Sequence, residues 1–237
     1  MIFSYERRGL PEGNEVFIFQ DLLDSKQTLR ELGKPLEELF SVKYIYLPEW
    51  QHWTRPIVLE KFKEAGRNEL WPLLFETPME KVMVASGFSF SFWNQVFLSN
   101  LNLFKRCFLF NPELDSSGRV GNFIEISQSF WKRQGFHFFE WLEIQPIAHH
   151  LATIQEKQKP IYPFPFTVFR SQPNSERFAK SSLLLQKNFT NLEINSLANT
   201  TWDGIKKSMA GKKLLLKTVC EEYKVKKDKI WSGLIKV

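Results

Sequence analysis

The chain has 237 residues, with 32 Lys and Arg against 26 Asp and Glu, a formal net charge of +6 and a hydrophobic fraction of 43%. This composition is ordinary for a globular protein and excludes wholesale disorder. No apolar run approaches the roughly 18–20 residues that a membrane-spanning helix needs. Phe is unusually frequent at 23 residues, whereas Gly occurs only 11 times. The length predicts a single domain, and the aromatic side chains are enough for a large core.

Six short apolar runs along the chain predict buried β-strands. Most are followed by Pro, Gly or polar residues, which end a strand. Near-continuous apolar runs indicate strands that are covered on both faces, which is typical of parallel sheets. In chain order the runs are 16–19, 42–47, 81–86, 107–110, 166–169 and 192–194.

The stretches between these runs are long enough for crossover helices. Apolar residues recur at helical spacing in 24–40, 57–75 and 91–104. The alternation of strand and helix predicts an α/β fold with a mostly parallel sheet and helices on both faces. The aromatic-rich segment 115–160 breaks this rhythm, and we interpret it as an inserted helical cap. The predicted organisation is a core in two parts, residues 1–114 and 161–237, with the cap between them.

The thiols and the N-terminal segment predict the compartment. Two cysteines, Cys107 and Cys220, are too few for a disulfide framework and are typical of free thiols in a reducing environment, so we expect a cytoplasmic protein. Residues 1–10 carry charges where a signal peptide would be apolar, so we expect no signal peptide. Two Cys and four scattered His do not fit a zinc site. We therefore expect neither a metal nor a cofactor.

The most informative motif follows the run 81–86. Gly87, Ser89 and Ser91 have the spacing Gly-x-Ser-x-Ser, close to the Gly-x-Ser-x-Gly of a nucleophile elbow. Such a turn is so tight that its flanking residues must be small, and it exposes the Ser hydroxyl at the carboxyl edge of the sheet. The next residue, Phe90, begins a helix whose backbone N–H can stabilise an oxyanion. Ser89 is therefore a candidate nucleophile, and Phe90 a candidate oxyanion donor.

With this motif in its strand–turn–helix context, the chain resembles the α/β-hydrolase family over about residues 1–217. The resemblance implies that the loop after 16–19 helps build the oxyanion hole. Gln20 and Asp21 stand there in place of the usual His and Gly, and Leu22 would supply the second N–H. It also implies that 115–160 is the lid. The aromatic residues of this segment would either line an apolar acyl-binding cavity or pack the lid on the sheet. The candidate ligand-binding residues are Gln20, Asp21, Phe88 and Trp141.

The sequence departs from the family at the two remaining catalytic positions. Asn174 stands at the acid position and Asn199 at the base position, and no His follows His150. An amide is not basic near neutral pH, so Asn199 cannot take a proton from Ser89. A carboxylate at Asp21 would also repel a developing oxyanion. These departures favour a divergent member that binds a small acyl or ester-type ligand, or a protein partner, without efficient hydrolysis.

Two alternatives stay open. The first is an active serine esterase or thioesterase, in which Asp115 replaces the acid and a His replaces the base. The candidate histidines are His52, His137, His149 and His150.

The second alternative concerns the basic end of the chain. Residues 206–229 contain nine Lys and three acidic residues, so the net charge of +6 lies there and the rest of the chain is neutral. Apolar residues at 205, 209, 214–216 and 219 predict an amphipathic helix that docks on the sheet with its Lys side chains in solvent. Alternatively, the protein is a binding module whose Lys-rich segment binds an anionic partner, such as an acidic carrier protein or a membrane surface. No nucleic-acid-binding motif is present, so we do not expect a nucleic acid as partner.

Overall fold

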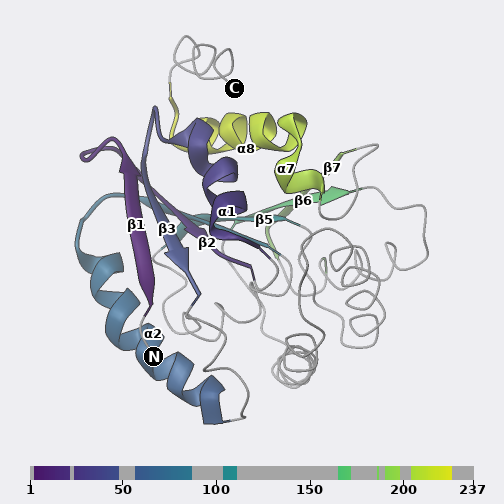
Figure 1. Ribbon diagram of the computed structural model, residues 1–237. Helices are drawn as coiled ribbons and strands as arrows, with labels where there is room; N and C mark the ends of the chain where they lie inside the picture. The colour runs from purple at the N-terminus through teal and green to yellow at the C-terminus, as the bar shows by residue number, and fades with distance from the viewer. Residues whose placement is uncertain are drawn as a thin grey trace.

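The computed structural model describes residues 3–21, 24–47, 57–86, 104–110, 165–171, 186, 190–197 and 204–225. Within them, seven strands form a single sheet (Figure 1). All six predicted strands are confirmed, and one further strand, β1, precedes them. The strands are β1 (Ser4–Gly9), β2 (Glu15–Phe19), β3 (Ser41–Tyr46), β4 (Lys81–Ser86), β5 (Phe104–Phe110), β6 (Phe166–Ser171) and β7 (Leu192–Leu197).

The strand order is β1-β3-β2-β4-β5-β6-β7. Every neighbouring pair is parallel except β1 with β3, which is antiparallel. From β2 the chain moves outward to β3 on one side and then returns to β4 on the other. The order in which the chain adds strands therefore reverses between β2 and β4, which is a topological switch point. In open α/β sheets, ligands bind at the carboxyl ends of the strands at such a point.

Strand β1 escapes a prediction from apolar runs because it lies at the sheet edge. Its sequence is SYERRG, and most of its residues are exposed. It pairs along its whole length with β3, from Ser4 opposite Tyr46 to Gly9 opposite Ser41. Charged side chains on an edge strand discourage pairing with another chain.

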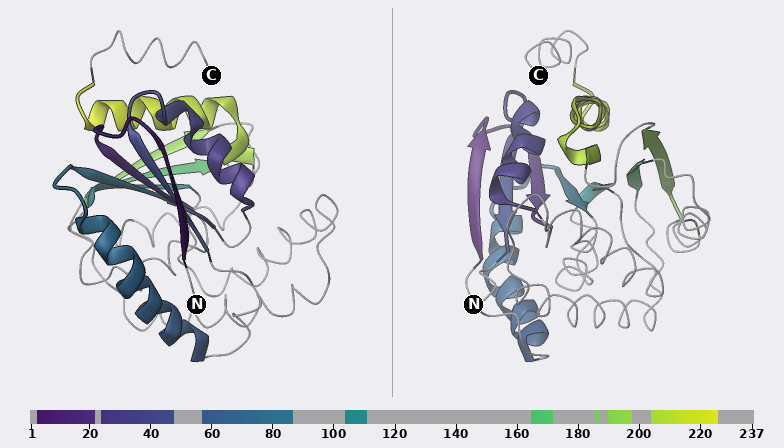
Figure 2. Two further views of the ribbon diagram at one scale, coloured as in Figure 1. Left: turned by 60° about the vertical axis from the view of Figure 1, so that its left-hand side comes forward. Right: turned by 45° about the vertical axis from the view of Figure 1, so that its right-hand side comes forward.

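Helices cover the sheet on both faces (Figure 2). Helix α1 (Lys26–Gly33), which continues into a 3₁₀ turn (Lys34–Leu36), lies on one face with α7 (Gly204–Lys207) and α8 (Met209–Glu222). Helix α2 (Ile57–Phe75) lies on the other face and has the predicted bounds. The predicted helix 24–40 is shorter than expected. Ser25 caps α1 so that it starts at Lys26, and the α-helix ends at Gly33, where the 3₁₀ turn with Pro35 follows. The predicted helix 91–104 and the predicted cap 115–160 fall outside the described residues, apart from residue 104 in β5.

The core on the α1 and α8 face is built by alternate strand residues. Leu29 and Leu32 of α1 and Leu215 and Leu216 of α8 are buried in one cluster with them. The strand members of this cluster include Val16, Ile18, Val42, Tyr44, Val82, Val84, Phe108 and Phe110. Gly33 lets α1 approach closely, since a Cβ there would collide with the Tyr44 hydroxyl and with Ile18. Each fully buried Leu contributes about 1.5–3 kcal/mol relative to an exposed one.

The C-terminal helix confirms most of its sequence-based prediction. Leu215, Leu216 and Val219 are buried, whereas Lys213 and Lys217 are exposed. Two residues differ from the prediction. Met209 is exposed rather than docked, and Lys206 is buried rather than solvated. The reason for the second difference lies at the carboxyl edge of the sheet.

Candidate functional site

The carboxyl edge of the sheet leads into every loop on which the sequence places a candidate residue. Strand β4 ends at Ser86, directly before Gly87, and β7 ends at Leu197, two residues before Asn199. Eight of the ten candidates lie outside the described residues, so their assigned roles stay predictions. They are Leu22, Phe88, Ser89, Phe90, Asp115, Trp141, Asn174 and Asn199.

Strands β2 and β4 separate at this edge. Their backbone pairing runs from Glu15 opposite Lys81 to Ile18 opposite Val84. Beyond that point β2 follows β3, with Phe19 opposite Ile45, whereas β4 follows β5 up to Ser86 opposite Phe110. The loop after β2 and the turn after β4 therefore start where the two strands are no longer paired with each other.

Gln20, the first candidate that the structure describes, organises the loop after β2. Its side-chain Oε1 accepts a hydrogen bond from the Leu47 N–H at 2.9 Å, and its Nε2 donates to the Asp24 carbonyl at 2.7 Å. Its backbone N–H donates to the Ile45 carbonyl at 3.0 Å. Gln20 thus ties the end of β2 to the end of β3 and to the start of α1. These contacts favour a role in shaping the loop, and ligand binding by Gln20 stays a prediction.

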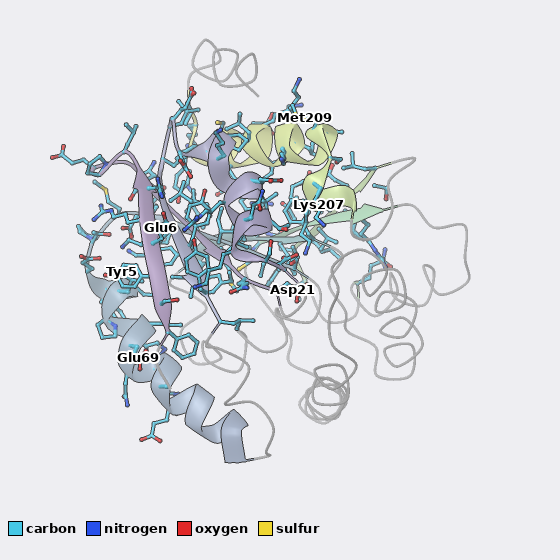
Figure 3. The ribbon with its side chains drawn as sticks, viewed as in Figure 1. Tyr5, Glu6, Asp21, Glu69, Lys207 and Met209 are labelled. Atoms are coloured by element: carbon cyan, nitrogen blue, oxygen red, sulfur yellow. The ribbon has the colours of Figure 1, made fainter. Side chains whose placement is uncertain are left out.

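Asp21, the second described candidate, belongs to a buried polar group that the sequence did not reveal. We call Asp21, Asp24, Ser86 and Lys206 the carboxyl-edge cluster. All four residues are buried. Figure 3 labels Asp21 and also Lys207, the neighbour of Lys206 on α7.

Lys206 is the centre of the carboxyl-edge cluster. Its Nζ lies 2.7 Å from both carboxylate oxygens of Asp24 and donates to Ser86 Oγ at 3.2 Å. It also lies 3.7 Å from Asp21 Oδ2. Ser86 Oγ in turn donates to Asp21 Oδ2 at 3.3 Å. One ammonium group on α7 thus faces two carboxylates from the loop after β2 and a hydroxyl from the end of β4.

Local structure explains how these side chains arrive at one place. Ser25 caps α1 by accepting a hydrogen bond from the Thr28 N–H at 3.1 Å, which places Asp24 just before the first turn. Ser208 caps α8 in the same way through the Gly211 N–H at 3.0 Å. This cap separates α8 from the short helix α7, which carries Lys206 to the sheet.

The charges of the cluster decide what chemistry it can perform. Lys206 faces two carboxylates, and such an environment favours the charged ammonium. An ammonium has three N–H donors and no lone pair, so Lys206 cannot take the proton of Ser86. The contact between Ser86 and Lys206 is therefore not a Ser–Lys catalytic pair. Asp21 points toward Ser86 and Lys206, and its charge is partly compensated there.

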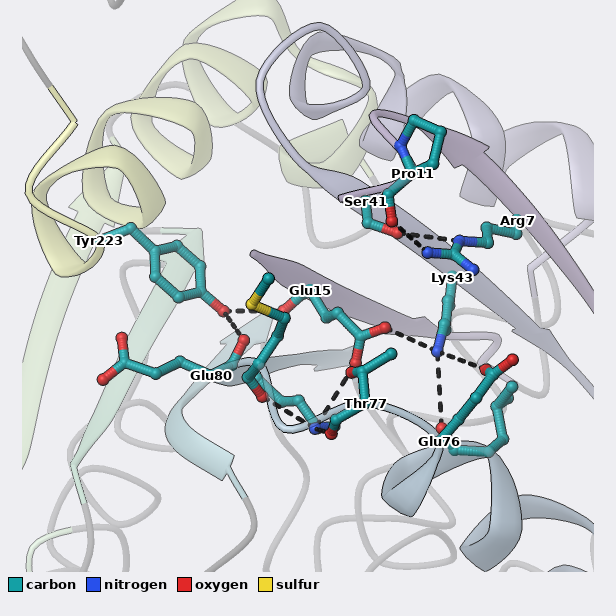
Figure 4. Close-up of polar contacts among 12 residues, drawn as sticks. Arg7, Pro11, Glu15, Ser41, Lys43, Glu76, Thr77, Glu80 and Tyr223 are labelled. Carbon is teal, nitrogen blue, oxygen red and sulfur yellow. Dashed lines mark hydrogen bonds and ion pairs between the residues drawn. The ribbon is translucent and has the colours of Figure 1, made fainter. Parts of the chain in front are cut away.

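A second ionic group lies at the opposite, amino end of the strands, and all its members are buried except the half-exposed Glu76 (Figure 4). We call Glu15, Lys43, Glu76 and Lys81 the amino-edge cluster. Lys43 Nζ lies 2.7 Å from Glu15 Oε1 and 3.1 Å from Glu76 Oε2. Lys81 Nζ lies 3.6 Å from Glu15 Oε2 and donates to the carbonyls of Thr77 and Met79. This cluster lies far from the loops at the carboxyl edge.

Tyr223 lies close to the amino-edge cluster on the α8 side. Its hydroxyl lies 2.8 Å from the Glu15 carbonyl oxygen and 2.9 Å from the Glu80 carbonyl oxygen (Figure 4). Burial raises the pKa of Tyr223, and the neighbouring Glu80 and Glu15 add to the increase. The neutral hydroxyl is therefore kept as a donor, and it holds the end of α8 over the start of β2.

The described residues contain no group of three or more His, Cys, Asp and Glu side chains arranged to hold a metal ion. None of the described helices is long and apolar enough to cross a membrane.

Comparisons with known proteins identify the fold. The sequence matches no family profile and no curated protein. Solved structures match over nearly the whole chain. An α/β-hydrolase enzyme from a metagenome of lagoon sediments at Mar Chica, Morocco, has a TM-score of 0.59 at 12% identity, covering 94% of this chain and 96% of that one.

Two further structures have comparable coverage. A carboxylesterase structure from Nitrososphaera gargenis has a TM-score of 0.64 at 10% identity and covers 94% of this chain and 95% of its own. Est816, described as an N-acyl homoserine lactone degrading enzyme, has a TM-score of 0.58 at 10% identity and covers 90% and 95%. Together with the strand order, these matches show that the chain has the α/β-hydrolase fold.

Proposed function

We propose that the protein binds a small acyl or ester-type ligand at the carboxyl edge of its sheet and does not hydrolyse it efficiently. The observation that carries the proposal is that backbone pairing between β2 and β4 ends at Ile18 and Val84, where the order of the strands reverses. In open α/β sheets ligands bind at such a change of direction. The loop of Gln20 and Asp21 and the turn of Ser89 both start there.

The lack of efficient hydrolysis rests on proton transfer. A Ser nucleophile needs an adjacent base, and the base position holds Asn199. Lys206, which contacts Ser86 at the end of β4, is paired with Asp24 and does not act as a base. Ser89 would then keep the low reactivity of an ordinary hydroxyl.

A second candidate is an active serine esterase or thioesterase with a non-standard base. It is supported by Ser89, which follows β4 at nucleophile-elbow spacing, and by hydrolases among the similar folds. This enzyme would need Asp115 and one of His52, His137, His149 or His150 to meet Ser89.

A fluorophosphonate probe separates the two candidates, because it reacts with activated serines. We expect labelling no faster than that of the Ser89→Ala variant. Rapid stoichiometric labelling that disappears in Ser89→Ala would overturn the proposal and establish the esterase. The binding half of the proposal is tested by ¹⁹F NMR with an alkyl trifluoromethyl ketone. We expect a non-covalent bound signal, and a spectrum unchanged by the protein would exclude an acyl site.

A further inference from the structure

The carboxyl-edge cluster spans the place where β2 and β4 separate. Backbone pairing between these strands stops at Ile18 and Val84. Past that point, the hydrogen bond from Ser86 to Asp21 connects the ends of β2 and β4, and Lys206 contacts both residues. Side chains thus provide the connection between the two strand ends that the backbone no longer makes.

The four members of the cluster adjoin three loops of the proposed site. Asp21 and Asp24 flank Leu22, Ser86 directly precedes Gly87 and the turn of Ser89, and Lys206 follows the segment of Asn199. The link from Lys206 to Asp24 joins residues 182 positions apart, and the link from Lys206 to Ser86 joins residues 120 apart. A single ammonium group therefore fixes three loop origins relative to one another.

We propose that Lys206 is a positioning residue of the acyl site: it sets the separation between the loop after β2 and the turn after β4. The proposal rests on the proposed function, because it concerns the geometry of the same site. It does not place Lys206 in contact with the ligand. Buried, fully hydrogen-bonded ion pairs hold a fixed geometry because breaking them exposes an uncompensated charge.

The test compares Lys206→Met with Lys43→Met. Both variants remove a buried ammonium group and keep an unbranched side chain, but Lys43 lies in the amino-edge cluster, away from the site. Affinity for the alkyl trifluoromethyl ketone is measured by ¹⁹F NMR on folded protein. We expect about tenfold weaker binding for Lys206→Met and unchanged binding for Lys43→Met, since small displacements of site loops have large effects on binding.

Two further variants keep the test decisive if Lys206→Met does not fold. Ser86→Ala leaves the ion pair of Lys206 with Asp24 intact and removes only the bridge to β4, so we expect weaker binding with near-normal stability. Lys206→Arg keeps the charge and should recover part of the affinity. If the role of Lys206 is purely structural, all variants lose stability, but their affinities for the ketone do not follow this order.

Hydrogen exchange provides a readout that needs no ligand. In Ser86→Ala, peptides that contain Asp21 to Asp24 or Ser86 should exchange faster, and peptides around Glu15 and Lys43 should be unchanged. Equal affinity in wild type, Lys206→Met and Ser86→Ala, with unchanged exchange, would overturn the role of Lys206 and leave the proposed function intact. If the wild type does not bind the ketone, while exchange is still faster in Ser86→Ala, the proposed function is overturned and not the role of Lys206.

Discussion

The amino-edge and carboxyl-edge clusters have the same chemistry but connect different parts of the fold. Each buries a Lys against carboxylates, with side-chain exposures of 0% for Lys43 and 1% for Glu15, and of 8% for Lys206 and 3% for Asp24. The amino-edge cluster joins strands that the backbone already pairs, since Glu15 lies opposite both Ser41 and Lys81. The carboxyl-edge cluster joins segments at the point where backbone pairing has ended.

Burial and charge alone therefore do not identify a functional residue. The effect of a buried ion pair also depends on which segments it connects and on whether backbone pairing already connects them. A cluster among paired strands changes the stability of the fold. A cluster across diverging strands also changes the geometry of the loops that those strands carry.

The largest effect on stability is expected at the amino edge. Among the described residues, Glu15→Ala leaves the buried Lys43 with the half-exposed Glu76 as its one carboxylate partner. Breaking one side of a buried pair costs about 3–5 kcal/mol, and we expect the lower part of this range because Glu76 remains. Urea unfolding monitored by circular dichroism measures the loss. Affinity for the trifluoromethyl ketone should stay at the wild-type value.

The double variant Glu15→Leu/Lys43→Met is the control for this prediction. Replacing both charges by apolar side chains removes the uncompensated ammonium group, so most of the lost stability should return. If the double variant is as unstable as Glu15→Ala, or if Glu15→Ala weakens ketone binding, the separation between the two clusters fails.

An intermediate effect is expected for Asp24→Asn at the carboxyl edge. The amide keeps the size of the side chain but leaves Lys206 with Asp21, 3.7 Å away, as its carboxylate partner in the cluster. Losing a charge-assisted hydrogen bond costs about 2 kcal/mol. Unlike Glu15→Ala, this variant should also weaken ketone binding. A loss of stability with unchanged binding would count against the positioning role.

The smallest effect is expected from the exposed ionic network on β1. Partial burial opposes the ionisation of Glu6, but hydrogen bonds from Tyr46, Arg8 and Arg30 outweigh it and lower the pKa to about 2 from 4.5. A depressed folded-state pKa stabilises the protein above pH 4.5, and this contribution is lost as the pH falls toward about 2.

Glu6→Gln should therefore cost about 0.5 kcal/mol near neutral pH, because solvent and salt screen the network. Urea unfolding of the variant and the wild type, from neutral pH down to about pH 3, should show the difference shrinking. A difference that grows on acidification would contradict the assigned direction of the Glu6 pKa.

Much of the fold was predictable because its signals are local. Six strands contain short runs rich in apolar residues, and α2 follows helical spacing from Ile57 to Phe75. Strand β1 was missed because SYERRG carries no apolar run and is a strand only through its pairing with β3.

The site was less predictable because its organisation is not local. Lys206 lies in a Lys-rich segment, which predicts that its side chain is in solvent. Nothing near it in the sequence indicates that Asp24 is its partner. The motif of Ser89 follows β4 as predicted, but the sequence gives no sign that Ser86, three residues earlier, is bonded to Asp21 and Lys206.

The most direct test of the account is an experimental structure of the protein with the alkyl trifluoromethyl ketone bound. We predict that the ketone lies between the carboxyl ends of β2 and β4, beside the loop of Gln20 and Asp21, and is not bonded to Ser89. The ion pair of Lys206 with Asp24 should stay intact beneath it. A ketone bound elsewhere, or one joined covalently to Ser89 Oγ, would contradict the account.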